Sequence, residues 1–380
     1  MDAGNLKILG LTHGDPFNRH SFSGSNYGLF TELEKREVLF SAHDIDIYGI
    51  RKKLLALPQF SMNREKWGQK YNASETVFKA RSDNATCICK KCKEDINCII
   101  QIGAMFSPST SDIPVTSYHD GNIALAFRGG GHSVVNQLQK TTYNQLVERE
   151  RTIYIKNDAI FTFSDYVKQS IIKDFGINED KIHVVYGGSN IEVPNLTKHE
   201  LDNKYHNKNI LFVAVDFARK GGSTVIEAFK IVKREVPEAT LTIVGSSPDI
   251  KEDGVNVSGF INKNTLTGEK QLAQYFTNAS VYVLPSLYEA FGVSYIEAMH
   301  FRTPCIGSNI AAIPELITDG ETGFVIKPED YITLADKIIQ ILRSPQLIRD
   351  MGDSGYAKAQ EKFTWERVAG KMMAVMQKLI

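Results

Sequence analysis

Residues 286–298, SLYEAFGVSYIEA, are the stretch that decides the fold of this chain. The short apolar run before them, 281–285, ends in a proline and predicts a buried strand. Residues 293–301 predict a helix, because their apolar side chains recur at helical spacing. Glu289 is therefore expected in the loop that follows a strand, and Gly292 at the start of the next helix.

The residue types in this stretch indicate a site for a phosphorylated polyol. Free amides at a helix N-terminus bind anions, and a glycine lets a phosphate or sugar approach the backbone closely. Glu297 lies about one turn further into the helix. Glu289 and Glu297 would then offer acceptors to hydroxyls at two ends of a ligand that carries phosphates. The alternative is that two glutamates at this spacing are ordinary surface carboxylates.

The same pattern of strand, loop and helix recurs at residues 209–232. An apolar run at 209–215 predicts a strand, DFARKGG at 216–222 forms the loop, and Ser223 is expected to cap a helix. Arg219 and Lys220 stand beside two glycines before that helix. This arrangement suits a diphosphate, and a solvated pair of charges is the alternative.

The first half of the chain also opens with a strand, a loop and a helix, expected at 6–11, 13–25 and 26–36. It lacks a G-x-G-x-x-G sequence, so a dinucleotide cofactor is not expected. Residues 44–50 alternate and predict a second strand. Two more strands are expected at 98–103 and 113–119. His119 would end the last of these and point into the crevice where α/β sheets bind ligands.

Further elements follow from periodicity and turn residues. Helices are expected at 134–150, 166–175 and 266–278 and from 331 onward, with strands at 159–164, 181–186, 239–245 and 255–261. Residues 126–132 contain three consecutive glycines and predict a flexible loop, in which Arg128 could meet an anionic acceptor. Residues 190–208 show little periodicity and predict a linker. The chain would thus form two domains, 1–190 and 205–364.

Composition limits the possible functions. A chain of 380 residues can hold two domains, and 44 basic against 44 acidic residues give no basic field for nucleic acid. No apolar run approaches the ~18 residues of a membrane span. The N-terminus lacks the basic and apolar regions of a signal peptide. A cytoplasmic protein without a nucleic-acid partner is expected.

Four of the five cysteines are close together in sequence, at Cys87, Cys89, Cys92 and Cys98. Such a cluster could hold zinc, but the spacing does not match paired C-x2-C knuckles. Reduced free thiols are the favoured interpretation. Cys305 stands alone in an apolar strand and is expected in the core.

The block from Glu289 to Glu297 resembles the E-x7-E signature of retaining glycosyltransferases of family four. The resemblance continues through 303–307 and 313–325 and covers roughly 205–345. It implies the GT-B architecture, an α/β fold with two Rossmann-like domains whose parallel sheets face each other across a deep cleft. It also implies acceptor binding by residues 1–190, donor binding by 205–364, and packing of the segment 365–380 against the first domain.

The implied reaction transfers a hexose from a UDP- or GDP-linked donor to an acceptor hydroxyl. The acceptor would be a glycan, a lipid-linked molecule or a small molecule, in glycan, polysaccharide or glycolipid synthesis. No metal or other cofactor is implied. By resemblance, His119 and Glu289 would be catalytic. The implied donor-binding residues are Gly24, Ser25, Arg219, Lys220, Phe291, Gly292, Val293, Ser294 and Glu297.

Departures from the family pattern leave alternatives open. Val215 or Asp216 stands where the family has an arginine, so Arg219 would substitute. Asp44 and Asp46 resemble the D-x-D metal motif of single-domain glycosyltransferases, which the two-domain pattern argues against. Nucleotide-sugar 2-epimerases share the architecture but lack the E-x7-E block. A non-catalytic sugar-nucleotide sensor and a peripheral association with membranes are further alternatives.

Overall fold

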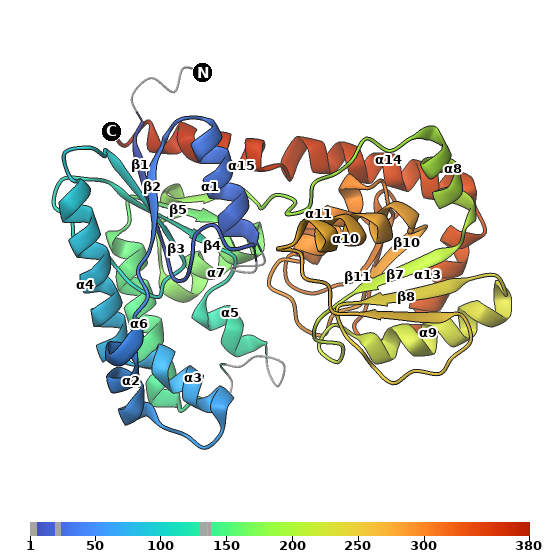
Figure 1. The fold of residues 1–380 in the computed structure, drawn as a ribbon, viewed down its shortest axis with the longest axis horizontal. Helices are drawn as coiled ribbons and strands as arrows, with labels where there is room; N and C mark the ends of the chain where they lie inside the picture. The colour runs from blue at the N-terminus through green and yellow to red at the C-terminus, as the bar shows by residue number, and fades with distance from the viewer. Residues whose placement is uncertain (1–5, 20–23, 130–134, 136–137) are drawn as a thin grey trace. The chain divides into compact units, whose positions relative to one another are not determined.

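The computed structural model describes residues 6–19, 24–129, 135 and 138–380 (Figure 1). The chain divides into two compact units. The first contains residues up to 186 together with 365–380, and the second contains 187–364. The boundary predicted from sequence fell within 190–205, a few residues after the division in the structure.

The first unit is a parallel sheet covered by helices. In the described residues its strands are β1 Ile8–Thr12, β2 Leu39–Asp44, β3 Cys98–Ile102, β4 Val115–His119, β5 Ala159–Thr162 and β6 Ile182–Val184. The helices named below are α1 Ser25–Lys35, α2 Gly49–Ala56, α3 Arg64–Ala73, α4 Glu75–Cys92, α5 Ile123–Arg128, α6 Lys140–Lys156, α7 Asp165–Phe175 and α15 Trp365–Met376, with a short 3-10 helix, η2, at Leu57–Gln59. The sheet order is β2-β1-β3-β4-β5-β6.

The second unit repeats this architecture. Its described strands are β7 Asn209–Val213, β8 Thr240–Val244, β9 Val255–Gly259, β10 Val281–Leu284, β11 Cys305–Ser308 and β12 Gly323–Ile326. Its helices are α8 Lys198–His206, α9 Gly222–Glu235, α10 Leu266–Asn278, α11 Val293–His300, α12 Ile313–Leu316, α13 Tyr331–Leu342 and α14 Pro345–Lys362. The sheet order is β12-β11-β10-β7-β8-β9.

The order of strands locates the switch point of the second sheet. Strands β1, β3, β4, β5, β10 and β11 are buried along their whole length, as expected for parallel strands covered on both faces. In the second unit the chain starts at β7 and winds outward in both directions, so the switch point lies between β7 and β10. In doubly wound sheets the crevice lies at the carboxyl ends of such a pair.

The C-terminal helix packs within the first unit. Helix α15 runs beside α1, and a Cβ placed on Gly28 would collide with the indole of Trp365. Gly28 therefore provides the space that the Trp365 ring occupies. The sequence prediction had placed residues 365–380 against the same domain.

The predicted strand at 44–50 is wrong. The second strand is β2, and Gly49 begins α2. Asp44 ends the strand, and its carboxylate accepts hydrogen bonds from the N–H groups of Gly14 (2.9 Å) and Asp46 (2.8 Å). The alternation that suggested a strand is therefore a turn, which Asp44 stabilises through local hydrogen bonds.

The predicted linker at 190–208 is also wrong in part, because residues 198–206 form α8. A reciprocal capping box between Thr197 and Glu200 starts this helix. Its Lys204 is fully buried, and Nζ donates to the carbonyls of Phe276 (2.7 Å) and Ala279 (3.0 Å). Nζ also donates to the Thr303 hydroxyl at 2.7 Å. Lys204 thus joins α8 to three other residues of the second unit.

Two helix starts and one loop differ from the sequence prediction. Helix α6 begins at Lys140, not 134, and residues 126–128 of the predicted loop belong to α5. The rest of the predicted glycine loop, 130–132, lies outside the described residues. Ser223 lies inside α9, whose N-cap is Gly221.

Candidate functional site

The loops after β7 and β10 meet at the switch point of the second sheet. Gly221 has φ 79°, and a Cβ there would collide with the carbonyl oxygen of Pro285. The Leu287 N–H donates to the Arg219 carbonyl oxygen at 2.9 Å. Only glycine permits this close approach together with this backbone conformation.

This junction brings together two side chains that the sequence analysis singled out. Lys220 Nζ forms an ion pair with the Glu289 carboxylate. The two side chains are 16% and 11% exposed, so the pair is largely desolvated while one side still reaches water. The sequence gives no sign of this direct contact, because the two residues come from different loops.

Arg219 forms hydrogen bonds within both loops of this junction. Its Nε lies 3.1 Å from Asp216 Oδ2, and its Nη1 donates to the Tyr288 carbonyl oxygen at 3.0 Å. Partial burial acts to raise the pKa of Asp216, but hydrogen bonds from the Arg219 backbone and guanidinium lower that pKa below its ordinary value. Both cations of this loop thus have a carboxylate partner: Arg219 pairs with Asp216 of its own loop, and Lys220 pairs with Glu289 of the loop after β10.

Three helices that follow the sheets' inner strands begin in the same way. Gly24, Gly221 and Gly292 are the N-caps of α1, α9 and α11, with φ of 94°, 79° and 96°. None offers a side chain to cap the first-turn amides. By contrast, Ser164 caps α7 and Thr265 caps α10 through side-chain oxygens. A start at glycine leaves the helix end open to an anion.

The remaining predicted residues of the opening stretch lie around α11. Phe291 is buried, and Val293 and Ser294 are half-buried in the first turn. Glu297 is buried, which raises the pKa of its carboxyl, while Lys263 and the backbone N–H of Asn190 act in the opposite direction. Glu297 therefore joins α11 to two other segments of the second unit.

His119 ends β4 as predicted, but its ring is only 1% exposed. Ring Nε2 lies 2.8 Å from the Ser117 hydroxyl, which also accepts from Asn157 Nδ2 at 2.6 Å. Desolvation lowers the pKa of His119 to about 3, so the imidazole is neutral. The structure thus gives His119 a buried hydrogen-bond network, and its proposed catalytic role stays a prediction.

Gly24 ends the loop before α1 as its N-cap, and Ser25 is the first residue of α1 and is buried. Sequence reasoning missed a polar cluster beside the preceding loop. Arg81 is buried on α4, and its Nε donates to Asp46 Oδ1 at 2.8 Å. Arg81 Nη2 lies 2.7 Å from His13 Nε2. Asp46 is thus a partner of Arg81 and His13 instead of a strand residue.

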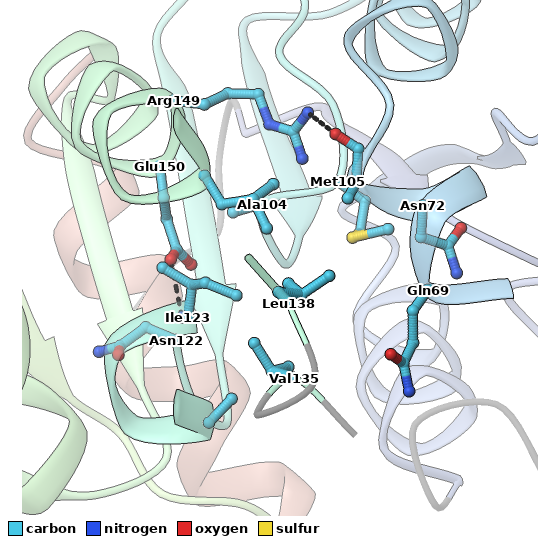
Figure 2. Close-up of a pocket in the computed structure, with 13 residues that line it drawn as sticks. Gln69, Asn72, Ala104, Met105, Asn122, Ile123, Val135, Leu138, Arg149 and Glu150 are labelled. Carbon is cyan, nitrogen blue, oxygen red and sulfur yellow. Dashed lines mark hydrogen bonds between the residues drawn. The ribbon is translucent and has the colours of Figure 1, made fainter. Parts of the chain in front are cut away.

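A cavity of about 380 Å³ lies in the first unit (Figure 2). Figure 2 shows Gln69 and Asn72 from α3 on one side and Arg149 and Glu150 from α6 on the other. Apolar side chains form most of the wall between them, among them Met105, Ile123, Leu138 and Leu146. Its size is in the range of small-molecule sites. No residue in the cavity had been predicted as a site residue.

Charged groups on α6 give this cavity its electrostatic character. Arg149 Nη1 donates to the Ala73 carbonyl oxygen at 3.2 Å, and burial lowers the pKa of its guanidinium. Burial raises the pKa of Glu150 to about 7. The Glu150 carboxyl accepts from the Ile123 N–H at 2.8 Å and the Tyr154 hydroxyl at 2.9 Å. Arg149 is the one basic side chain among the described residues that line the cavity, and its Nη1 also lies 3.7 Å from the carboxylate of the exposed Glu75.

The surface arginine considered for an anionic acceptor is already engaged. Arg128 forms an ion pair with Asp174 on α7.

The cysteine cluster does not converge in space. Cys87 is exposed on α4, while Cys89 on the same helix is buried in the core. Cys98 is buried at the start of β3. Within the described residues, no three His, Cys, Asp or Glu side chains are arranged to hold a metal ion. None of the described helices is long and apolar enough to cross a membrane.

Comparisons with known proteins agree with this fold. Residues 196–358 match the family model of "Glycosyl transferases group 1". The chain is 27% identical to an MMP alpha-(1->4)-mannosyltransferase of Mycolicibacterium hassiacum over 74% of this chain and 68% of the relative. Several other curated relatives are matched over only 54% to 65% of their own length.

Solved structures resemble the chain over nearly its whole length. Sucrose-phosphate synthase from Thermosynechococcus elongatus has a TM-score of 0.69 at 20% identity, with 98% of this chain and 99% of that chain covered. Anabaena Alr3699/HepE in complex with UDP and glucose has a TM-score of 0.64 at 15% identity, with 98% and 100% covered.

The two six-strand parallel sheets in the described residues and these neighbours define an α/β protein with the GT-B fold. Most of the second unit, residues 196–358, is similar to the group 1 glycosyltransferase domain. That match and the named relatives support a glycosyltransferase.

Proposed function

We propose that this protein is a retaining glycosyltransferase of the family-four type that transfers a hexose from a UDP- or GDP-linked donor to an acceptor hydroxyl. The observation that carries the proposal is the Lys220–Glu289 pair at the switch point between β7 and β10. Both residues lie within the segment that matches the group 1 family. Retention is proposed from the E-x7-E spacing of Glu289 and Glu297.

The ion pair suggests how the donor is received. In the described structure Lys220 and Glu289 satisfy each other, which avoids an uncompensated charge in a largely desolvated place. A nucleoside diphosphate sugar would replace this pair by two new ones. Its diphosphate would take the Lys220 ammonium, and its sugar hydroxyls would donate to the Glu289 carboxylate.

Helix starts would complete the diphosphate site. The uncapped first turns of α9 and α11 offer amides beside Lys220 and the Glu289 loop. Negative charge develops on the leaving diphosphate as the glycosidic bond breaks, so a lysine and fixed amide dipoles favour the transition state. These groups would act without a metal ion. Glu297 would accept from ribose hydroxyls.

We further propose that the cavity in the first unit receives the acceptor. Its apolar walls suit an apolar part of the acceptor, and Arg149 suits a phosphate or carboxylate on the same molecule. The amides of Gln69 and Asn72 would bind hydroxyl groups. This chemistry favours an amphipathic anionic acceptor over a neutral oligosaccharide.

The test is an incubation with UDP- and GDP-linked hexoses in the absence of acceptor. A transferase should release free hexose slowly, and NMR of the first-formed sugar should show the anomeric configuration of the donor. Formation of an isomeric nucleotide sugar would indicate an epimerase instead. Binding without any turnover, also in the presence of anionic amphipathic acceptors, would indicate a sensor.

A further inference from the structure

An apolar stripe on the first unit faces solvent. Ile50, Leu54 and Leu57 are 76%, 62% and 64% exposed, and their spacing of four and three residues puts them on one face of α2 and the adjoining η2. No residue of α2 is buried. Single exposed leucines are ordinary, but a continuous helical stripe indicates an interaction site.

The opposite face of α2 holds the helix to the fold. Leu55 and Ala56 pack against a small core formed by Ile47, Tyr71, Val77 and Ala80. The Trp67 indole N–H donates to the Ala56 carbonyl oxygen at 2.9 Å. The exposed stripe is therefore a fixed surface. It continues past η2 at Phe60 and Met62, the latter 96% exposed.

Basic residues surround this stripe. Residues 48–70 contain six Lys or Arg and one acidic residue, in a chain whose net charge is zero. Arg51 and Lys53 flank the stripe on α2, and Arg64 and Lys66 follow at the start of α3. In the part of the chain that the structure describes, no carboxylate lies within ion-pair distance of Lys53, Arg64 or Lys66. Their charge is available to an outside partner.

We propose that α2, η2 and the start of α3 form a docking surface for membranes rich in anionic lipids. An apolar stripe between cations, on the outer side of a helix, is the pattern of a segment that lies in the lipid headgroup region. The positive excess matches the negative charge of such a surface. In Figure 1 α2 and α3 lie together at the lower end of the first unit, where they would contact the lipid at the same time.

This surface adjoins the cavity proposed for the acceptor. Helix α3 supplies Arg64 and Lys66 to the docking surface at its first turn and Gln69 and Asn72 to the cavity further on. A membrane-bound amphipathic acceptor would thus reach the cavity over a short path. The docking surface itself does not depend on the proposed function.

The test is co-sedimentation of the full chain with vesicles of phosphatidylcholine, alone or mixed equally with phosphatidylglycerol. The protein should bind the mixed vesicles and not the neutral ones. Binding should weaken strongly in about 1 M NaCl, where the screening length falls to ~3 Å. Failure to bind mixed vesicles at low salt would overturn the proposal.

Two pairs of substitutions separate the apolar and the electrostatic contributions. Leu54→Ser with Leu57→Ser should lower binding about tenfold or more. Lys53→Glu with Lys66→Glu should lower it by at least about 25-fold, since each removed cation accounts for about fivefold. The matched controls in the second unit are Leu266→Ser with Ile332→Ser, both exposed, and Lys198→Glu with Lys327→Glu. They should bind like the unsubstituted chain.

Two more measurements keep the result unambiguous. Melting curves and donor hydrolysis without vesicles should be unchanged in the leucine variant, so its loss of vesicle binding would not reflect unfolding or a lost donor site. Light scattering reports on self-association. A concentration-dependent dimer that the leucine substitutions abolish, with vesicle binding retained, would show that the stripe contacts a second copy of the chain and would contradict the proposal.

Discussion

The candidate donor site of the second unit and the cavity of the first unit are built in opposite ways. The donor site consists of loops at strand ends, where Lys220 and Glu289 are paired and glycines start the helices. The cavity is formed largely by helices, with apolar walls and one cation, Arg149. The contrast teaches that two units with similar sheets can present different chemistry. Loops at strand ends bring charged side chains together, whereas helices beside the sheet enclose an apolar cavity.

Glu289→Gln should have the largest effect and should act on turnover. The amide keeps the size of the side chain but loses the charge that would favour the sugar as it becomes positive in the transition state. We expect kcat to fall about 100-fold, with a smaller change in donor KM. Steady-state kinetics with donor and acceptor varied separately measure both. Glu227→Gln on the exposed side of α9 is the control and should change neither.

Arg149→Ala should act on the acceptor alone. Loss of a charge-assisted contact should raise the KM of an anionic acceptor about tenfold and leave donor KM unchanged. Arg151→Ala, two residues along α6 and outside the cavity lining, is the control. If Arg149→Ala raised the donor KM instead, the assignment of the two regions to two substrates would be wrong.

Glu150 should make the stability of the first unit depend on pH. Its folded pKa, raised by burial to about 7 from 4.5, means that the folded state binds more protons than the unfolded state between these values. The contribution of Glu150 to the free energy of unfolding is fully present below about pH 4.5 and is lost as the pH rises through about 7. Its size is at most about 3 kcal/mol.

Glu150→Gln removes this titration while it keeps an acceptor for the Ile123 N–H. The free energy of unfolding in urea should be measured for both proteins at about pH 5 and about pH 8. Relative to the unsubstituted chain, the variant should be more stable at about pH 8 than at about pH 5. If the difference in unfolding free energy between the two proteins were the same at both pH values, Glu150 would not be the group that titrates between them.

Chelation should have the smallest effect on turnover. If Lys220 and helix amides stabilise the leaving diphosphate, transfer should continue in EDTA at an unchanged rate. A complete loss that Mn²⁺ or Mg²⁺ restores would contradict this and would place a metal ion in the site.

The strand and helix around Glu289 could be predicted because one local pattern fixes them. A short apolar run, a proline and a glycine before helical spacing leave few alternatives, and the structure has β10 and α11 at these positions. At Asp44 the local pattern misled, because side-chain hydrogen bonds to Gly14 and Asp46 form a turn that alternation cannot reveal. The local sequence was therefore sufficient to predict an element where backbone preferences determine it, and insufficient where side-chain hydrogen bonds do.

Contacts between distant segments could not be predicted. The Arg149 guanidinium is positioned by a hydrogen bond to the Ala73 carbonyl oxygen, and the Glu150 carboxyl by a hydrogen bond from the Ile123 N–H. Neither partner can be identified from a single sequence, so no sequence pattern predicted the cavity. Lys204 is a similar case, because a lysine in a polar segment is normally exposed, yet this one is buried against two carbonyls. The Lys220–Glu289 contact joins two residues that were each predicted, but their pairing was not.

Calorimetric titration of UDP and GDP into the Lys220→Ala protein at low salt tests the central claim most directly. Lys220→Ala should weaken binding of the preferred nucleotide by about 10- to 100-fold, the scale of one charge-assisted hydrogen bond. Lys230→Ala, which removes an exposed cation of α9 that pairs with Glu227, should leave the affinity unchanged. Equal affinity of Lys220→Ala and the unsubstituted chain would remove Lys220 from the site and contradict the account.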